Sequence, residues 1–275
     1  MGKFDGIAIL SDLDGTFLGK GGRMVERNVE AINYFKAEGG LFSIATGRMH
    51  YSLGKMVTGV DTLVNAPALL CNGTYLYDFE TDTVLDEIVM DGEMAYAAMA
   101  FVRENFPSAS MRISYRDGFR MDPCDVKAIS QIVDFGIDEK KIDDFALWDK
   151  EEWYKVVCTD DASRIPSIRV AIETKFPDVF EFNCSGAHLL EMQMKGVNKA
   201  SMLEPFRAYY RKKGRELKIY ACGDFENDFP LLRAADVAVC PSNALQGIQD
   251  ICDLCLCSHD KGVIADLVEH LKKAE

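Results

Sequence analysis

The sequence lacks several features that mark membrane, secreted and repeat proteins. Its 275 residues contain no apolar run long enough to span a bilayer. The apolar part of the N-terminal stretch MGKFDGIAIL is too short for a secretion signal. There is also no internal repeat and no low-complexity linker. We therefore expect a globular cytoplasmic protein with no membrane partner.

Positive charge is also in short supply. The chain has 31 Lys and Arg against 44 Asp and Glu, which leaves a formal net charge of -13. A field of this sign repels the phosphate backbone of nucleic acids and does not attract anionic lipid. We expect no nucleic-acid partner. Any phosphate that the protein binds must be held locally, by a few cations or backbone amides.

The nine cysteines do not form a pattern of paired metal-binding motifs. The densest group is Cys252, Cys255 and Cys257 with His259 nearby, and its spacing has some similarity to a zinc site. A second CxxC pair is missing, however, and the alternation of Ile, Leu and Cys predicts a short strand. We favour the strand over the zinc site, and we interpret most cysteines as small buried side chains kept reduced in the cytoplasm.

What the chain does have is apolar material: 48% of its residues are hydrophobic, enough for a substantial core. Short apolar runs of strand length alternate with longer segments of helical period in the first third and again in the last third. This alternation predicts an α/β fold with a parallel, Rossmann-like sheet and crossover helices.

The middle of the chain follows a different pattern. Segments such as TYLYDFETDTVLDEIVM and MRISYRDGFRM predict hairpins, and they alternate with two helical segments. Antiparallel strands with helices indicate an α+β unit. We therefore predict a catalytic core made of residues 1–80 and 191–275, interrupted by an inserted α+β cap at residues 81–190 that sets substrate specificity.

Polar residues gather directly after the predicted core strands. In an open parallel sheet, ligands bind beyond the carboxyl ends of the strands, so these residues are candidates for one site. Four acidic groups at one sheet edge would repel one another unless a cation neutralised them, and oxygen ligands suit Mg²⁺. We expect a magnesium site formed among Asp12, Asp14, Asp224 and Asp228, with Thr46, Gly47, Arg48, Asn72 and Asn227 beside it.

A carboxylate beside Mg²⁺ can attack phosphorus and form an aspartyl-phosphate. A second carboxylate two residues further on can protonate the leaving oxygen and later deprotonate the attacking water. Each motif alone has a simpler explanation: DLDGT as a strand ending in an Asp-Gly turn, ATGR as an ordinary strand-to-helix turn, and GDFEND as a helix N-cap. Their occurrence after three core strands favours one reaction centre.

Phosphoryl transfer also needs a cation for the charge on the phosphoryl oxygens. The segment QMKGVNKAS offers Lys195, before the glycine, and Lys199, which we expect in the first turn of a helix capped by Asn198. Spacing does not choose between the two lysines.

The motifs together resemble the haloacid dehalogenase superfamily, in its Cof-type phosphatase branch with a large α+β cap of type IIB. The resemblance covers both core portions and rests on motifs in the same order around a large insert: DLDGT at 12–16, ATGR at 45–48, CNGT at 71–74, GVNK at 196–199, GDFEND at 223–228, SNA at 242–244 and DKGV at 260–263.

The resemblance implies a role for each matching residue. Asp12 would be the nucleophile and a metal ligand, and Asp14 the general acid/base, which also binds magnesium through its main-chain carbonyl. The amides of Leu13 and Gly47 and the side chains of Thr46, Lys199 and Asn227 would bind phosphate. Asp224 would be the remaining direct metal ligand. Asp228 would lie next to the metal ligands without binding the metal directly. Arg48 would be a weaker candidate for contacting substrate.

Asp14 also separates reactions within the superfamily, because its carbon-halogen hydrolases lack this second aspartate. The resemblance therefore implies a magnesium-dependent phosphomonoester hydrolase acting on sugar phosphates or similar small phosphorylated metabolites. A phosphomutase of phosphomannomutase type and a catalytically silent phosphometabolite-binding protein are the alternatives. The sequence does not fix the oligomeric state.

Overall fold

The computed structural model describes residues 2–116, 118–122 and 142–273, and their contacts divide the chain into two compact units. One unit is discontinuous and consists of Met1–Glu87 and Asn198–Glu275, and the other is Ile88–Val197. These divisions fall at 87/88 and 197/198, whereas the sequence suggested 80/81 and 190/191.

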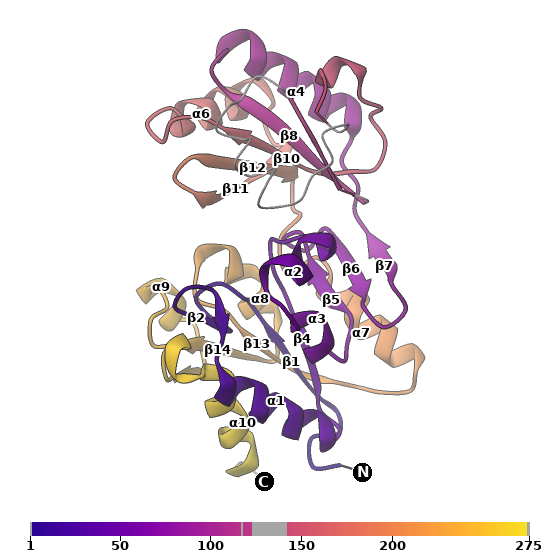
Figure 1. The fold of residues 1–275 in the computed structure, drawn as a ribbon, viewed down its shortest axis with the longest axis vertical. Coiled ribbons are helices and arrows are strands. Elements are labelled where there is room, and N and C mark those ends of the chain that lie inside the picture. The colour runs from indigo at the N-terminus through magenta and orange to yellow at the C-terminus, as the bar shows by residue number, and fades with distance from the viewer. Residues whose placement is uncertain (1, 117, 123–141, 274–275) are drawn as a thin grey trace. The chain divides into compact units, whose positions relative to one another are not determined.

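A five-stranded parallel sheet forms the centre of the first unit, which confirms the predicted α/β core (Figure 1). The order of its strands is β15-β14-β13-β1-β4. The elements of this unit are β1 (Ile7–Ser11), β2 (Leu18–Gly19), β3 (Arg23–Met24), α1 (Glu26–Ala37), β4 (Leu41–Ile44), α2 (His50–Met56), α3 (Val60–Leu63), β5 (Ala68–Leu70), β6 (Tyr75–Asp78), β7 (Thr83–Glu87), α7 (Leu203–Lys212), β13 (Lys218–Cys222), η3 (Glu226–Asp228), α8 (Phe229–Ala234), β14 (Val237–Pro241), α9 (Gln246–Gln249), β15 (Leu254–Leu256), η4 (His259–Lys261) and α10 (Val263–Lys273).

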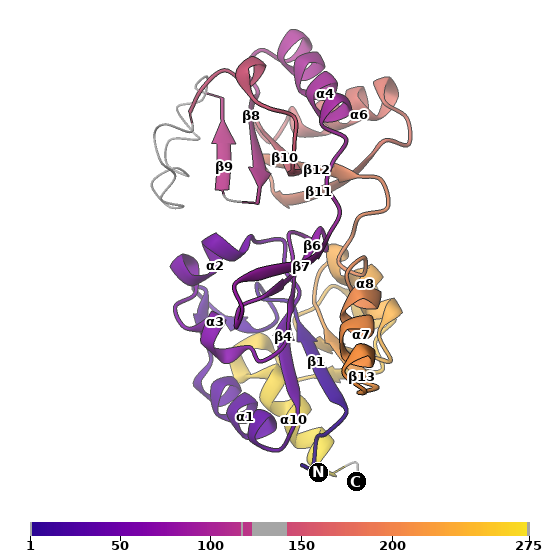
Figure 2. The ribbon, with the colours of Figure 1, turned by 90° about the vertical axis from the view of Figure 1, so that its right-hand side faces the viewer.

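Helices cover both faces of this sheet, as a parallel sheet requires. Helices α1 and α10 lie side by side on one face, and α7 and α8 lie on the other (Figure 2). Ala8 and Leu10 alternate along β1 and pack with Phe206 of α7, and all three are fully buried. Burial of a side chain such as Leu10 stabilises the fold by about 1.5–3 kcal/mol. These contacts hold β1, and with it the loop that follows.

The strand after ATGR differs from the expectation. Strand β5 was predicted as a core strand, but it heads a separate antiparallel sheet of order β5-β6-β7 and meets the parallel sheet through an isolated bridge between Ala45 and Leu69. The cause is local, because Cys71, Asn72 and Gly73 have φ angles of 51°, 52° and 81°. Successive left-handed residues reverse the chain directly after β5.

The helix predicted from Asn198 begins later than expected. Helix α7 starts at Leu203, and residues 199–202 form turns. Asn198 Oδ1 accepts a hydrogen bond from the Ala200 amide at 3.0 Å, so its side chain closes a local turn instead of capping a helix. Lys199 therefore lies in a turn ahead of the helix, and the prediction that it occupies a first helical turn was wrong.

In its described residues, the second unit is an antiparallel sheet with the helices α4 (Gly92–Asn105) and α6 (Ile165–Lys175) on one face (Figure 1). Its strand order is β11-β12-β10-β8-β9. Residues such as Ile113, Val156 and Met192 face α4 and α6 and form the core of the unit with Trp153. The elements are α4 (Gly92–Asn105), β8 (Ser110–Tyr115), β9 (Gly118–Met121), η2 (Phe145–Leu147), β10 (Trp153–Thr159), α6 (Ile165–Lys175), β11 (Phe180–Gly186) and β12 (Leu189–Met194).

The described residues bear on two sequence expectations, one about membrane-spanning helices and one about the cysteine-rich segment. None of the helices there combines the length and the apolar character needed to cross a membrane. The cysteine-rich segment contains strand β15 (Leu254–Leu256), as predicted.

Candidate active site

The candidate site lies at the carboxyl edge of the parallel sheet. Asp12 follows β1, Thr46 follows β4, Asp224 follows β13 and Asn243 follows β14. Because these strands are parallel, their carboxyl ends meet at one edge. The sheet therefore gathers residues from four separate loops.

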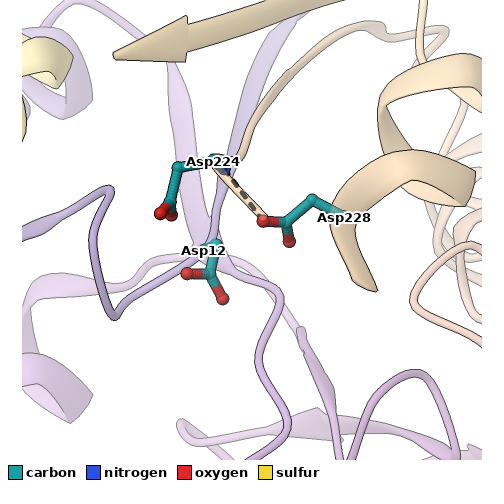
Figure 3. A group of neighbouring side chains, drawn as sticks. All are labelled: Asp12, Asp224 and Asp228. Atoms are coloured by element: carbon teal, nitrogen blue, oxygen red, sulfur yellow. Dashed lines mark hydrogen bonds between the residues drawn. The ribbon is translucent and has the colours of Figure 1, made fainter. Parts of the chain in front are cut away.

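Three aspartates form the centre of the site (Figure 3). Each of Asp12, Asp224 and Asp228 offers an oxygen atom, and these atoms all lie within 4.8 Å of one another. Asp12 is only 7% exposed and Asp228 only 1%. Carboxylates this close and this buried repel one another, so the cluster needs compensating positive charge.

Lys199 supplies part of that charge. Its Nζ donates to Asp12 Oδ1 and to Asp228 Oδ1, each at 2.5 Å, and its side chain is fully buried. Lys195, the other lysine that the sequence offered, is 54% exposed and pairs with Glu181 at 3.4 Å in the second unit. The structure therefore places Lys199, and not Lys195, in the cluster.

The shifted pKa values reflect this crowding of charge. Burial raises the pKa of Asp12 to about 8; Lys199 opposes this shift, while Asp228 and Asp224 add to it. Burial also raises the pKa of Asp224. Burial disfavours the charge on Lys199, but Asp12 and Asp228 outweigh this effect and raise its pKa. One ammonium among three carboxylates leaves an excess of negative charge, and a divalent cation fits that donor set.

Asp228 orders the loop that carries Asp224. Its Oδ2 accepts hydrogen bonds from the amides of Asp224 at 2.9 Å and Phe225 at 3.1 Å. A Cβ atom at Gly223 would lie 2.5 Å from the Asp228 Cβ, so this turn has no room for a side chain. Within the GDFEND motif, the Asp228 carboxylate thus fixes the loop that positions the Asp224 carboxylate.

Two residues at the edge of the site were not assigned roles from the sequence. Thr16 Oγ1 donates to Asp224 Oδ1 at 2.6 Å, and Asn243 Nδ2 donates to the Gly15 carbonyl at 2.8 Å. Gly15 has φ 84°, and a Cβ there would lie 2.3 Å from Asp224 Oδ2. Thr16 lies in the DLDGT motif and Asn243 in the SNA motif. Their positions directly after core strands are the sequence feature that could have identified them as site residues.

Of the expected phosphate-binding residues, Thr46 and Gly47 lie in the loop after β4, next to the loop after β5 that carries Asn72. The Asn72 amide donates to the Thr46 carbonyl at 3.0 Å, and the Arg48 amide donates to Thr46 Oγ1 at 3.3 Å. Asn227 Nδ2 contacts Asn72 Oδ1 at 3.4 Å. A Cβ at Gly47 would lie 2.9 Å from Asn72 Oδ1, so the two loops approach closely there. Leu13 next to Asp12 has a fully buried side chain.

Asp14 differs from the other aspartates of the motifs. Its side chain is 59% exposed, and it accepts hydrogen bonds from both Nε and Nη2 of Arg48, with distances of 2.8 Å to 3.0 Å. The sequence placed Arg48 toward substrate and did not anticipate this fork-shaped ion pair.

The geometry just described agrees with the chain's relationship to known proteins. A family model for haloacid dehalogenase-like hydrolases matches residues 9–268. The chain belongs to this family. The match includes all the strand-end loops of the site and the whole second unit, so the predicted family is confirmed.

Individual relatives are more distant. Over 78 residues the chain is 36% identical to the pyridoxal phosphate phosphatase YbhA of Escherichia coli, but the match spans only 28% of either protein. It is 22% identical to the 5-amino-6-(5-phospho-D-ribitylamino)uracil phosphatase YwtE of Bacillus subtilis, over 96% of this chain and 97% of that one. The structure of the subclass IIB sugar phosphatase BT4131 superposes with a TM-score of 0.78 at 18% identity, covering 97% of this chain and 99% of that one. This likeness confirms the fold.

Proposed function

We propose that the protein is a magnesium-dependent phosphomonoester hydrolase that works through an aspartyl-phosphate on Asp12. The observation that carries this proposal is the cluster of Asp12, Asp224 and Asp228 around the buried Lys199 ammonium, at the carboxyl edge of the parallel sheet. The chain is a phosphatase of the haloacid dehalogenase type.

The metal ligands would be the carboxylates of Asp12 and Asp224 together with the main-chain carbonyl of Asp14. Bound Mg²⁺ would neutralise the carboxylates and the phosphate oxygens, so that an anionic nucleophile can approach an anionic substrate. Asp228 would support this set from behind, because its oxygens are already engaged by Lys199 and by the amides of Asp224 and Phe225.

Asp12 is oriented for attack by its neighbours. Lys199 contacts Oδ1 of Asp12, and of the two carboxylate oxygens one would bind the metal and the other would form the new bond to phosphorus. Asp14 would donate a proton to the oxygen of the departing alcohol, and the same group would later take a proton from the water that hydrolyses the aspartyl-phosphate. Its exposure suits a group that exchanges protons in both half-reactions.

The phosphoryl oxygens would be bound by Thr46, by the amides of Leu13 and Gly47, by Lys199 and by Asn227. Such donors stabilise the charge that spreads over these oxygens in the transition state. The close contacts between the loops after β4 and β5 support this assignment, since they fix Thr46 and Asn72 against each other.

The substrate would be a sugar phosphate or a similar small phosphorylated metabolite. The relatives support this class, because their names specify pyridoxal phosphate, 5-amino-6-(5-phospho-D-ribitylamino)uracil and sugar phosphates as substrates. The inserted unit, Ile88–Val197, would select among such compounds, and the cytoplasm would supply them.

The test is phosphate release from p-nitrophenyl phosphate by the purified protein. We expect turnover with Mg²⁺, none in excess EDTA, and none from Asp12→Asn. The matched control is Asp61→Asn, which changes an exposed aspartate on α3 and should behave as the wild type. Full activity of Asp12→Asn would disprove the mechanism.

A further inference from the structure

Arg48 and Asp14 form an ion pair at the edge of the candidate site. Arg48 is 21% exposed and Asp14 is 59% exposed, so the contact lies where water competes with it. For most exposed ion pairs the contribution to stability is only about 0–1 kcal/mol, so this contact would be worth little if its geometry were loose. Its geometry is nevertheless well defined, because two different nitrogens of the guanidinium contact one carboxylate.

The backbone of Arg48 is anchored on both sides. Its amide donates to Thr46 Oγ1 at 3.3 Å, and its carbonyl accepts from the Cys71 amide at 3.0 Å. The guanidinium therefore extends from a fixed position toward the loop after β1. Through it, the loops after β1, β4 and β5 are joined at the edge that also carries Asp12.

Within the described part of the chain, the Asp14 carboxylate accepts its side-chain hydrogen bonds from Arg48. Its neighbours Asp12 and Leu13 are buried in the sheet edge, whereas the Asp14 carboxylate is the exposed member of the DLDGT motif. An exposed aspartate samples several rotamers, but a general acid must lie within hydrogen-bond reach of the oxygen that it protonates. A planar guanidinium that contacts both oxygens of the ionised carboxylate fixes the orientation of the group as well as its place. When one oxygen carries the proton for the leaving group, the other remains bound to Arg48.

We propose that Arg48 is the positioning residue for Asp14: its guanidinium orients the carboxylate that exchanges protons with the leaving group. This inference rests on the proposed phosphatase function. It concerns proton transfer to the leaving oxygen and not the binding of the phosphoryl group.

The dependence of turnover on the leaving group tests this role. Phenolate needs a proton far more than p-nitrophenolate does, while the two aryl phosphates have the same phosphoryl group. A positioned general acid contributes about 10²–10⁴-fold. From this range we expect Arg48→Gln to lower kcat/KM for phenyl phosphate by about tenfold to a hundredfold, and kcat/KM for p-nitrophenyl phosphate by less than about threefold. The ratio kcat/KM is the right measure because it reports formation of the aspartyl-phosphate, the step in which the leaving group departs, and not the later hydrolysis that both substrates share.

Two further variants sharpen the test. Arg48→Lys keeps the positive charge but cannot contact the carboxylate through two nitrogens. Its activity with phenyl phosphate should therefore lie between that of the wild type and that of Arg48→Gln. Adding Arg48→Gln to Asp14→Asn should cause almost no further loss, because the arginine would have no acid left to orient. Arg207→Gln is the matched control: Arg207 is also 21% exposed and pairs with Asp236 at 2.8 Å, away from the strand-end loops.

The outcomes separate this inference from the proposed function. Equal losses of kcat/KM with both substrates would show a structural role for Arg48 and overturn the inference, as would an unchanged or increased kcat/KM for phenyl phosphate. Additive losses in the double variant would overturn it as well. Absence of any turnover by the wild type, or full activity of Asp12→Asn, would instead overturn the phosphatase proposal and this inference with it.

Discussion

At the scale of single residues, the cluster depends on opposite charges that are almost completely withdrawn from water. Lys199 touches two carboxylates with no exposed surface of its own. Burying three such charges is expensive, and their attraction offsets this cost only while all partners are present. Replacing one charged residue should therefore destabilise the fold by more than the net contribution of the ion pair to stability, because it leaves the other charges buried without a partner.

Replacement of Lys199 is the direct test of this dependence. Lys199→Met leaves Asp12 and Asp228 buried without their cation, and removing one partner of a buried pair costs about 3–5 kcal/mol. We expect this loss in the free energy of unfolding, measured by urea denaturation in EDTA. Lys195→Met serves as the control, since its half-exposed side chain should contribute no more than about 0.5 kcal/mol. Similar losses for both variants would contradict the cluster's energetics.

Thr16 tests the support of a metal ligand. Thr16→Val has nearly the same shape but removes the hydroxyl that donates to Asp224 Oδ1. Loss of such an outer partner typically weakens metal binding about 10–100-fold, and we expect this change in the Mg²⁺ concentration needed for half-maximal turnover. Thr62→Val on α3 removes an exposed hydroxyl that donates to the Gly59 carbonyl, and it should leave the Mg²⁺ requirement unchanged.

At the scale of elements, the loop after β1 performs three tasks within five residues. Asp12 enters the cluster, Asp14 points toward Arg48, and Gly15 turns the chain with φ 84°. The strand brings these residues to the sheet edge because alternate positions such as Ala8 and Leu10 are buried among the core helices. The sheet thus provides a fixed base for a short loop with little freedom of its own.

Gly15 is where this loop is most restricted. In Gly15→Ala the new Cβ would meet both a left-handed backbone and Asp224 Oδ2 at 2.3 Å. We expect a loss of stability together with loss of Mg²⁺-dependent turnover. Gly214→Ala is the control, because Gly214 has φ 73° but nothing within 4 Å of its Cβ position. It should lose stability of about 1–2 kcal/mol and keep its turnover. Equal turnover in both variants would contradict the crowding at Asp224.

At the scale of the whole molecule, charge links stability to pH and to metal. The pKa of Asp12 is about 8 in the folded protein against 3.8 for an ordinary carboxyl, mainly because of burial. Between these values the folded state binds more protons than the unfolded state, so without metal this group makes stability fall as pH rises toward 8. The net charge of -13 adds repulsion over the same range.

Magnesium should reverse this dependence. Mg²⁺ binds the ionised carboxylate, so the stabilisation that it provides should grow as pH rises through about 7 and level off above about 8. The measurement is the difference in melting temperature with and without Mg²⁺, at about pH 6 and about pH 9 at constant ionic strength. Asp12→Asn should lose most of the pH dependence. A Mg²⁺ effect that is equal at both pH values would disprove the role of Asp12 titration.

Much of this arrangement could be predicted from the sequence because it is local. Apolar periodicity predicted the parallel core and the antiparallel insert, and the polar residues after strands predicted which loops meet. The exceptions have local causes that periodicity does not show. Three left-handed residues at 71–73 separate β5 from the parallel sheet, and the Asn198 turn delays α7 until Leu203.

The sequence alone indicates the kind of chemistry, because the types and order of the residues at the strand ends can be read without coordinates. The tertiary structure alone decided which groups touch. It brings Lys199 to Asp12 across 187 positions of sequence, leaves Lys195 exposed in the other unit, and turns Arg48 onto Asp14. The pKa of Asp12 is likewise a product of folding, because burial and neighbouring charge exist only once distant segments have packed together.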